Sequence, residues 1–404
     1  MTAPPLSESR PLIERAAAFS FLLLAAALPW SVAPISIGVV LCSALTLAAW
    51  WRPGGVRWVR TPLDLPALGW IAAMVIASLF SLDPSGSWPN VRKGFLFAIV
   101  PIAAYHARDR RVAGTAVAAL LASASAATIY ALARFIHDGG VFPARVKGLV
   151  GHALTYGGQA TLLAVVAIAL IARGPDRRWR IGAAAFLALL LPALAGTYTR
   201  SAWIATVVGT SVILARTRAR LLLVVGTALI AALCLAPTSY RQRALSAFDS
   251  RSIWNVERLY MWNAGARMFQ DHPITGVGLQ DLGELYDRYR SPLSHEPHGH
   301  LHSIVVQVGA TMGIIGLVAL AWLLIGLFRT AGHRWLEPLP RSDLAAALRL
   351  AAVAALVAFL IAGLFEWNLG DEELVDFLCV LVGMGYAASR WGTIGACPAP
   401  PRSS

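Results

Sequence analysis

Charged side chains are scarce in this chain. They make up 14% of its 404 residues, whereas hydrophobic residues make up 57%, and the mean hydropathy is +0.63. A soluble protein of this length needs more polar side chains than that to cover its surface. The composition therefore excludes a soluble globular domain and predicts an all-α polytopic membrane protein.

Cysteine and lysine are scarce too, and several cofactor motifs are missing. The four cysteines lie in apolar stretches or in the C-terminal tail, so we expect neither a disulfide framework nor a cysteine metal site. The sequence contains no Walker-type phosphate loop, no dinucleotide fingerprint and no internal repeat. We therefore expect no nucleotide cofactor. If the protein is an enzyme, its substrate must carry the energy for the reaction.

Apolar runs of membrane-spanning length fill most of the chain. About twelve can be read from the hydropathy pattern. They occupy residues 16–30, 31–51, 64–82, 93–106, 112–133, 150–172, 181–198, 202–215, 221–236, 303–328, 347–366 and 373–389. We accordingly predict nine membrane helices in 1–236, one large polar loop with amphipathic helices in 237–302, three membrane helices in 303–390, and a tail in 391–404.

The arginines between these runs predict the orientation. If the N-terminus is cytoplasmic, every arginine-rich turn, such as 108–111 and 173–180, falls on the cytoplasmic side, as the positive-inside rule requires. Both termini are then cytoplasmic, and the 237–302 loop lies outside. Most of the formal net charge of +13 is this topology signal, and acids balance the arginines of the loop. We therefore expect contact with membrane lipids and no nucleic-acid partner.

Two short helices are predicted inside the polar loop. Residues 253–270 have apolar side chains at helical spacing, which makes Leu259, Trp262, Ala266 and Phe269 the apolar stripe of an amphipathic helix. We expect this helix to lie on the outer membrane surface or to roof a cavity between the spans. The Asp271–His272–Pro273 sequence should end this helix, and Gly276 and Gly278 should permit a tight turn after it. A second short helix is expected around residues 282–289.

His302 is the candidate general base. It would lie at the outer N-terminal end of a membrane helix, where the helix dipole disfavours imidazolium and keeps the ring able to accept a proton. An interfacial histidine that merely caps the helix explains the position equally well. His298, His300 and His302 alternate and could bind a metal from an extended strand. The helix begins within this stretch, however, so we expect no metal.

Four basic residues are candidates for binding an anion. Arg200 stands in a minimal outer turn where topology disfavours positive charge, so it needs a partner or a function. Arg258 lies one turn before Trp262 on the loop helix, and Arg145 and Lys147 lie in another outer turn. An ordinary solvated arginine is the simpler interpretation of Arg258, and ordinary interfacial charges are the simpler one for the other pair. Several cations near a neutral histidine would suit a diphosphate leaving group and a hydroxyl nucleophile.

The last outer turn carries two acids, Glu366 and Asp371. By default these are solvated groups that mark the ends of helices, and their contribution to a site stays open. Asp371, together with Trp262, His298 and His300, is a candidate for lining an acceptor site or cavity.

Four motifs resemble the O-antigen ligase family, which also includes O-antigen polymerases and protein O-oligosaccharyltransferases. They are RVKG, GTYTRSAW, ERLYMWNAGARMFQDHPITGVG and HLHSIVVQVGATMGIIGL. The resemblance extends to about twelve spans with one large loop before the third-last span. Ser303 departs from the pattern, because the family usually has asparagine after the histidine, and this bears on how the imidazole is positioned.

The resemblance implies a glycosyltransferase of the bacterial inner membrane with its active site on the periplasmic side. It would transfer O-antigen polysaccharide from undecaprenyl diphosphate, the donor, to the lipid A–core oligosaccharide, the acceptor, with inversion and without metal or ATP. His302 would be the base, Arg200 and Arg258 would bind the diphosphate, and Arg145 and Lys147 would assist. An O-antigen polymerase of the same superfamily is the alternative. A non-enzymatic flippase or transporter fits less well, because intramembrane acids are scarce.

Overall fold

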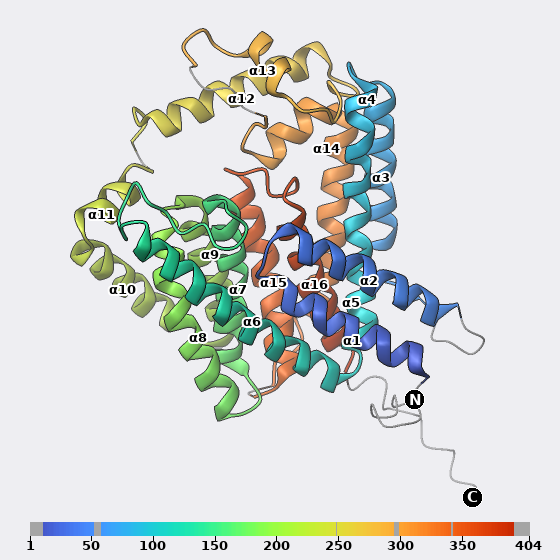
Figure 1. Ribbon diagram of the computed structural model, residues 1–404, viewed down its shortest axis with the longest axis vertical. Coiled ribbons are helices and arrows are strands. Elements are labelled where there is room, and N and C mark those ends of the chain that lie inside the picture. The colour runs from blue at the N-terminus through green and yellow to red at the C-terminus, as the bar shows by residue number, and fades with distance from the viewer. Residues whose placement is uncertain (1–10, 52–57, 248, 295–298, 341, 392–404) are drawn as a thin grey trace, which may run out of the picture.

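The computed structural model describes residues 11–51, 58–247, 249–294, 299–340 and 342–391. Throughout these ranges the regular structure is helical and contains no strand, which confirms the all-α prediction (Figure 1). His298 and all of the tail except its first residue lie outside the described residues, so the predictions for them stay untested.

A helix occupies each of the twelve predicted apolar segments, and the fourth is a 3₁₀ helix that continues as an α-helix. The helices in these segments are α1 (Leu12–Ala27), α2 (Val32–Trp50), α3 (Asp64–Leu79), η1 (Trp88–Ala98) with α5 (Ile99–Ala107), α6 (Arg110–His137), α7 (Ala153–Arg173), α8 (Arg177–Gly196), α9 (Arg200–Thr217), α10 (Leu221–Leu235), α14 (Ile304–Ala331), α15 (Leu344–Gly363) and α16 (Glu372–Ser389). The remaining helices are α4 (Pro84–Ser87), α11 (Thr238–Leu245), α12 (Ile253–Asp271) and α13 (Gly283–Tyr289).

Among the described residues, six helices are long and apolar enough to cross a membrane. These are α2, α6, α7, α8, α14 and α15. Others are shorter, such as α3, or carry acids, such as α16, whose first turn holds Glu372 and Glu373. The chain is therefore a multi-helix membrane protein, and the number of about twelve crossings stays a prediction.

Helices α7, α15 and α16 form the centre of the bundle, and small residues bring them close to their neighbours. A methyl group added at Gly385 would lie 2.4 Å from the Cβ of Ala352 on α15, and one added at Gly383 would lie 2.7 Å from the Cβ of Ala103 on α5. Close approach of this kind supplies the packing energy between helices where lipid removes the hydrophobic drive. Tight packing of α15 and α16 thus fixes the position of the turn between them.

Helix α14 breaks at Gly313, and the loop after α12 fills the gap. Gly313 has a φ of 59°, so the helical hydrogen bonds around it are interrupted. The loop replaces them through three bonds: Val277 N–H to the Ala310 carbonyl at 2.9 Å, Gly278 N–H to the Thr311 carbonyl at 3.0 Å, and Ile314 N–H to the Pro273 carbonyl at 2.9 Å. Backbone groups in a low-dielectric setting need such partners. The loop therefore fixes the half of α14 that begins just after residue 302.

The predicted turn at Gly276 and Gly278 is confirmed, with φ of 69° and 104°. Gly276 also lies against the broken helix, because a Cβ there would be 2.3 Å from the backbone nitrogen of Met312. Only glycine meets both demands at this position. The HPITGVG stretch is therefore a clamp on α14 as well as a turn.

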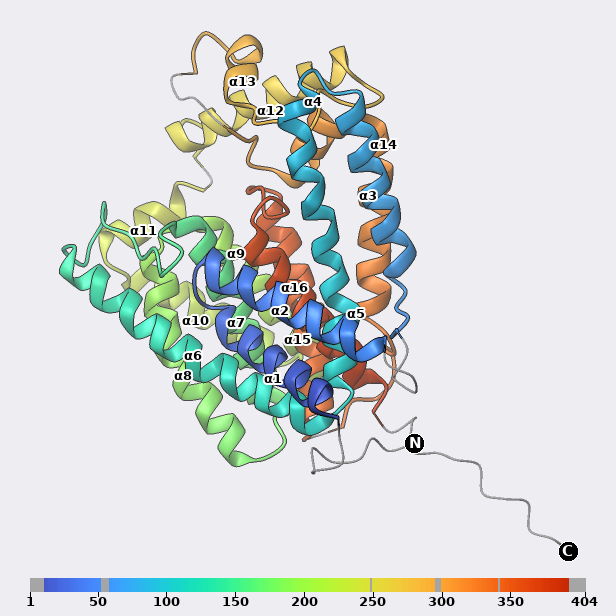
Figure 2. The same ribbon diagram turned by 45° about the vertical axis from the view of Figure 1, so that its right-hand side comes forward.

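The helix predicted at 253–270 is confirmed as α12, and its buried face differs from its predicted apolar stripe. The buried side chains are Glu257, Met261, Ala264, Gly265 and Met268, whereas Leu259 is 55% exposed. The reason is the contact with α14, where Gly265 allows α12 to approach Val306 and Leu301. The side of α12 that carries Leu259 therefore does not pack against α14. Figures 1 and 2 show α12 and α13 at one end of the molecule, beside the ends of α3 and α14.

Candidate active site

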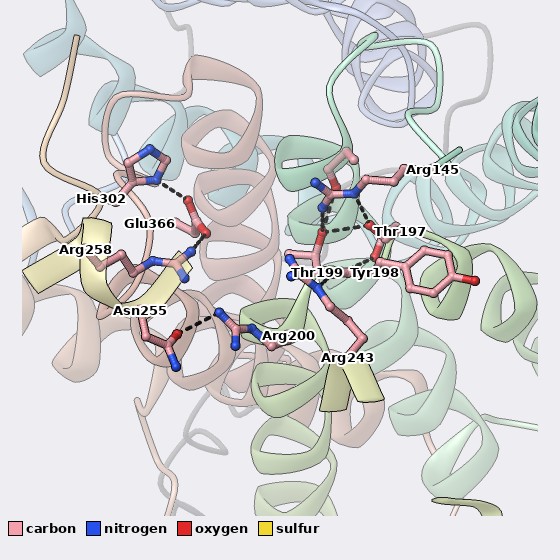
Figure 3. Close-up of polar contacts among 11 residues, drawn as sticks. Arg145, Thr197, Tyr198, Thr199, Arg200, Arg243, Asn255, Arg258, His302 and Glu366 are labelled. Atoms are coloured by element: carbon pink, nitrogen blue, oxygen red, sulfur yellow. Dashed lines mark hydrogen bonds and ion pairs between the residues drawn. The ribbon is translucent and has the colours of Figure 1, made fainter. Parts of the chain in front are cut away.

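Glu366 connects the two candidate residues His302 and Arg258. Its Oε1 accepts a hydrogen bond from Nη2 of Arg258 at 2.9 Å, and its Oε2 lies 2.8 Å from Nδ1 of His302 (Figure 3). Glu366 is only 7% exposed, in the turn between α15 and α16. The expectation that it is solvated is therefore wrong. The carboxylate can be buried because two donors compensate its charge.

The contact with Glu366 fixes the tautomer of His302. An ionised carboxylate can only accept hydrogen bonds, so Nδ1 must carry a hydrogen, and the lone pair of the neutral ring is on Nε2. The backbone of His302 is left-handed, with a φ of 45°, just before the Ser303 N-cap of α14. The structure thus places the histidine at the start of α14 as predicted. What the sequence did not reveal is the carboxylate that orients the ring.

Arg200 is a buried arginine, as its unfavourable position in the sequence suggested. It is the first residue of α9 and is 8% exposed. Its guanidinium donates to Oδ1 of Asn255 at 2.8 Å and to Oγ of Ser246 at 3.1 Å (Figure 3). Both partners are neutral. Among the described residues, the charge of Arg200 therefore has no carboxylate bonded to it, and the two bonds serve to orient the side chain.

Arg243 is a third arginine of this region, and the sequence reasoning missed it. Its Nε donates to the Tyr198 carbonyl at 3.1 Å (Figure 3). Its guanidinium lies 5.4 Å from the ring centroid of Trp254. It belongs to α11, a helix that the sequence analysis did not predict. Nothing in the sequence YRQRAL distinguishes Arg243 from Arg241, which lies two residues earlier and is exposed.

A cavity of about 330 Å³, called here the arginine cavity, brings these groups together. It is lined by Arg200, Arg243, Arg258 and Glu366, and by an apolar wall of Leu154, Ile204, Leu259, Trp262 and Phe365. Trp262 and the exposed side of α12 thus face a cavity. Three arginines against one carboxylate leave a surplus of positive charge in a partly desolvated space.

Mutual repulsion among the arginines is visible in their pKa values. Burial, followed by the charges of Arg243 and Arg258, lowers the pKa of Arg200 to about 10. Burial, followed by the charges of Arg145 and Arg258, lowers the pKa of Arg243. Arg200 therefore remains protonated at neutral pH. A bound anion would relieve this repulsion and would accept strong charge-assisted hydrogen bonds.

Arg145 does not line the arginine cavity but stabilises the turn that precedes Arg200. Its Nε donates to the Thr197 carbonyl at 2.6 Å and its Nη2 to Oγ1 of Thr199 at 2.9 Å, which secures the turn before Arg200 (Figure 3). Lys147 is exposed and is not among the residues that line the cavity. The structure therefore brings Arg200, Arg258 and His302 into one region, places Arg145 next to it, and leaves Lys147 at its margin.

A second cavity of about 280 Å³ contains two other candidates, His300 and Asp371. The ring of His300 lies 4.1 Å from that of His302, centroid to centroid. Asp371 accepts a hydrogen bond from Oγ1 of Thr155 at 3.1 Å. Burial, followed by the charge of Glu373, raises the pKa of Asp371 to about 6. Asp371 is therefore also not the solvated acid that its sequence position suggested.

Residues 184–321 of the chain match the family model described as O-Antigen ligase. Over this segment the chain is similar to the O-antigen ligases. The matched segment includes Arg200, Arg243, Arg258 and His302, whereas Glu366 and Asp371 lie beyond it. Comparison with curated proteins gives no match. The chain is thus a multi-helix membrane protein with a segment similar to the O-antigen ligases, a family that implies polysaccharide and lipid substrates.

Within the described residues, no group of three or more histidines, cysteines or acids is arranged to hold a metal ion. His298 lies outside them, so the three-histidine alternative stays untested. The groups that stand ready to neutralise an anion are the arginines of the arginine cavity.

Proposed function

We propose that this protein transfers a glycan from undecaprenyl diphosphate to a sugar hydroxyl of lipid A–core on the periplasmic side of the bacterial inner membrane. The observation that carries the proposal is the chain of contacts from Arg258 through Glu366 to His302 at the edge of the arginine cavity. It couples a group that binds the leaving diphosphate to a group that accepts a proton.

In this reaction, His302 removes the proton from the acceptor hydroxyl through Nε2. The acceptor oxygen attacks the anomeric carbon and forms the new glycosidic bond. The bond between that carbon and the phosphate oxygen breaks, and the diphosphate keeps the electron pair. Attack opposite the leaving group inverts the anomeric centre. Glu366 stabilises the imidazolium that forms, and a positioned base of this kind typically contributes about 10²–10⁴-fold.

The arginine cavity suits the donor for two reasons. Arg200, Arg243 and Arg258 can bind phosphate oxygens with bidentate hydrogen bonds, which offset the charge that develops on the leaving group. The apolar wall with Leu259 and Phe365 suits the first prenyl units beside the diphosphate. Because the glycosyl–diphosphate bond is already activated, the reaction needs no ATP.

A reconstituted assay tests the proposal. Purified protein in detergent receives carrier-linked glycan and lipid A–core without ATP, and both transfer and carrier-diphosphate binding are measured. We expect His302→Ala to abolish transfer while donor binding persists. Arg200→Lys and Arg258→Lys keep the charge but lose the guanidinium fork, so both should weaken donor binding. His300→Ala should be much milder than His302→Ala.

Three results would contradict the proposal. Full transfer by His302→Ala would remove the proposed base, and normal donor affinity in both arginine variants would remove the proposed diphosphate site. Absence of transfer by the unmodified protein with an intact donor would reject the reaction itself.

A further inference from the structure

The second cavity and the arginine cavity are both lined by residues that contact His302. One short segment, the turn between α15 and α16, serves both: Phe365 and Glu366 line the arginine cavity, whereas Trp367 and Asp371 line the second one. The segment before α14 is shared in the same way, because His300 lines the second cavity while His302 contacts Glu366. The proposed base therefore contacts one lining residue of each cavity, His300 and Glu366.

Amide side chains in the second cavity are anchored at one end and available at the other. Gln280 accepts hydrogen bonds through Oε1 from Oγ of Ser81 at 2.5 Å and from the Asp83 N–H at 3.1 Å. Gln307 accepts through Oε1 from the Leu301 N–H at 2.8 Å. In the part of the chain that the structure describes, the Nε2 groups of both glutamines make no hydrogen bond. They are held in place as donors that face a polar space.

Asn90 offers the complementary group. Its Nδ2 donates to the carbonyls of Leu279 at 2.9 Å and Gly86 at 3.3 Å, so its Oδ1 is the end that can accept from a ligand. Asp371 uses Oδ2 for Thr155, which leaves Oδ1 as a further acceptor. The second cavity thus combines fixed donors and fixed acceptors, which is what a ligand with several hydroxyl groups requires.

Charge and shape distinguish this cavity from the first. One cation, Lys93, faces two acids, Asp281 and Asp371, so the second cavity favours no anion. Lys93 is itself bonded to the Gly370 carbonyl at 3.1 Å. Trp70 and Trp367 supply flat apolar surfaces against which the C–H face of a sugar ring can pack. A volume of about 280 Å³ suits a small ligand such as one terminal sugar unit rather than a long glycan.

We propose that the second cavity is the acceptor subsite: it holds a terminal sugar ring by its hydroxyl groups and presents one hydroxyl to His302, opposite the diphosphate in the arginine cavity. This inference rests on the proposed function and adds the place and the chemistry of acceptor recognition. Gln280, Asn90 and Trp367 then determine which sugar is accepted, without contacting the donor.

Binding can be tested separately from transfer. Core oligosaccharide released from lipid A is added to the full-length protein in nanodiscs, and its binding is measured by saturation-transfer NMR. Gln280→Glu keeps the anchored oxygen but replaces the Nε2 donor, and Trp367→Ala removes the flat surface. We expect each to weaken oligosaccharide binding about tenfold. Undecaprenyl diphosphate, measured on the same preparations, should bind normally, which also shows that the variants are folded.

Matched controls are Gln270→Glu and Trp88→Ala, both at exposed positions outside either cavity. A free O-antigen repeat oligosaccharide serves as a second probe: preferential binding of core indicates a ligase, preferential binding of the repeat indicates a polymerase, and either supports a sugar subsite here. Unchanged oligosaccharide binding in both variants, or no binding of either sugar by the unmodified protein, would overturn the inference. Failure of the proposed function would appear in a different measurement, as a donor affinity that substitution of Arg200 and Arg258 does not change.

Discussion

Glu366 joins His302 to Arg258, with one carboxylate oxygen for each partner. We expect Glu366→Gln to lower the turnover number for transfer by at least about 100-fold, because the amide neither stabilises an imidazolium nor enforces the tautomer. Donor affinity should change much less, since Arg258 keeps its charge. Glu284→Gln, an exposed acid on α13, is the matched control. Comparable activity in the two variants would mean that Glu366 has only a structural role.

Arg243 should contribute to donor binding as much as Arg200 does. Arg243→Lys loses the Nε bond to the Tyr198 carbonyl and the fork that can hold two phosphate oxygens. We expect carrier-diphosphate affinity to fall by about 10- to 100-fold, in the range for hydrogen bonds to charged groups. Arg241→Lys on the same helix should bind donor normally. An equal effect of both substitutions would point to the net charge of α11 rather than to a placed guanidinium.

Transfer should persist in excess EDTA, because the arginines of the arginine cavity neutralise the diphosphate. The measurement is the initial rate in the reconstituted assay before and after chelation. Inactivation by EDTA with recovery on adding Zn²⁺ would instead favour a site made by His298, His300 and His302.

The sequence predicted the positions of the helices well, but it did not predict which faces of the helices pack against each other. Hydropathy located α12 and α14 because apolar periodicity is a local property of the chain. The buried face of α12 could not be read locally: Gly265 and Ala264 face α14 because they permit close packing, while the larger Leu259 is left beside the arginine cavity.

The site followed the same pattern. Arg200 was identifiable because a cation in a minimal outer turn conflicts with topology. Arg243 and Glu366 were not, because each looks like an ordinary polar residue until the fold brings it to partners far along the chain. Glu366 meets Arg258 across 108 positions of sequence and His302 across 64. Contacts of that kind depend on tertiary packing, which no local pattern encodes.

Stability should depend on the clamp between the HPITGVG loop and the break in α14. Gly276→Ala would place a methyl group 2.3 Å from the Met312 backbone nitrogen at a φ of 69°, and Gly313→Ala would crowd the Ile274 carbonyl at 2.4 Å. We expect each to cost on the order of 2–4 kcal/mol and to lower the apparent Tm in detergent. Gly182→Ala, on α8 with open space around it, should leave Tm unchanged or raise it slightly. Equal Tm values for the three variants would contradict the clamp.

Acceptor binding should depend on pH through Asp371. Burial, and then Glu373, raise the pKa of this acid from 3.8 to about 6; Glu366 adds to the increase, and Lys93 and the Thr155 hydroxyl oppose it. Below about pH 6 the side chain is therefore protonated in the folded protein, and above it the side chain is a carboxylate. Other titratable groups nearby are Asp281 and His300, which line the same cavity, and His152, which lies 3.3 Å from the Thr155 hydroxyl.

A carboxylate accepts a stronger hydrogen bond from a sugar hydroxyl than a protonated acid does. Affinity for the core oligosaccharide should therefore rise as pH increases through about 6 and level off above it, while Asp371→Asn should give a flat profile. Folding stability should change in the opposite direction, because the unfolded chain ionises Asp371 near 3.8 and the folded chain only near 6, so stability is lost as pH rises across this interval. Asp287→Asn, at an exposed position, should keep the pH dependence of the unmodified protein. A step near pH 6 that survives in Asp371→Asn would assign the titration to another group and remove Asp371 from the acceptor subsite.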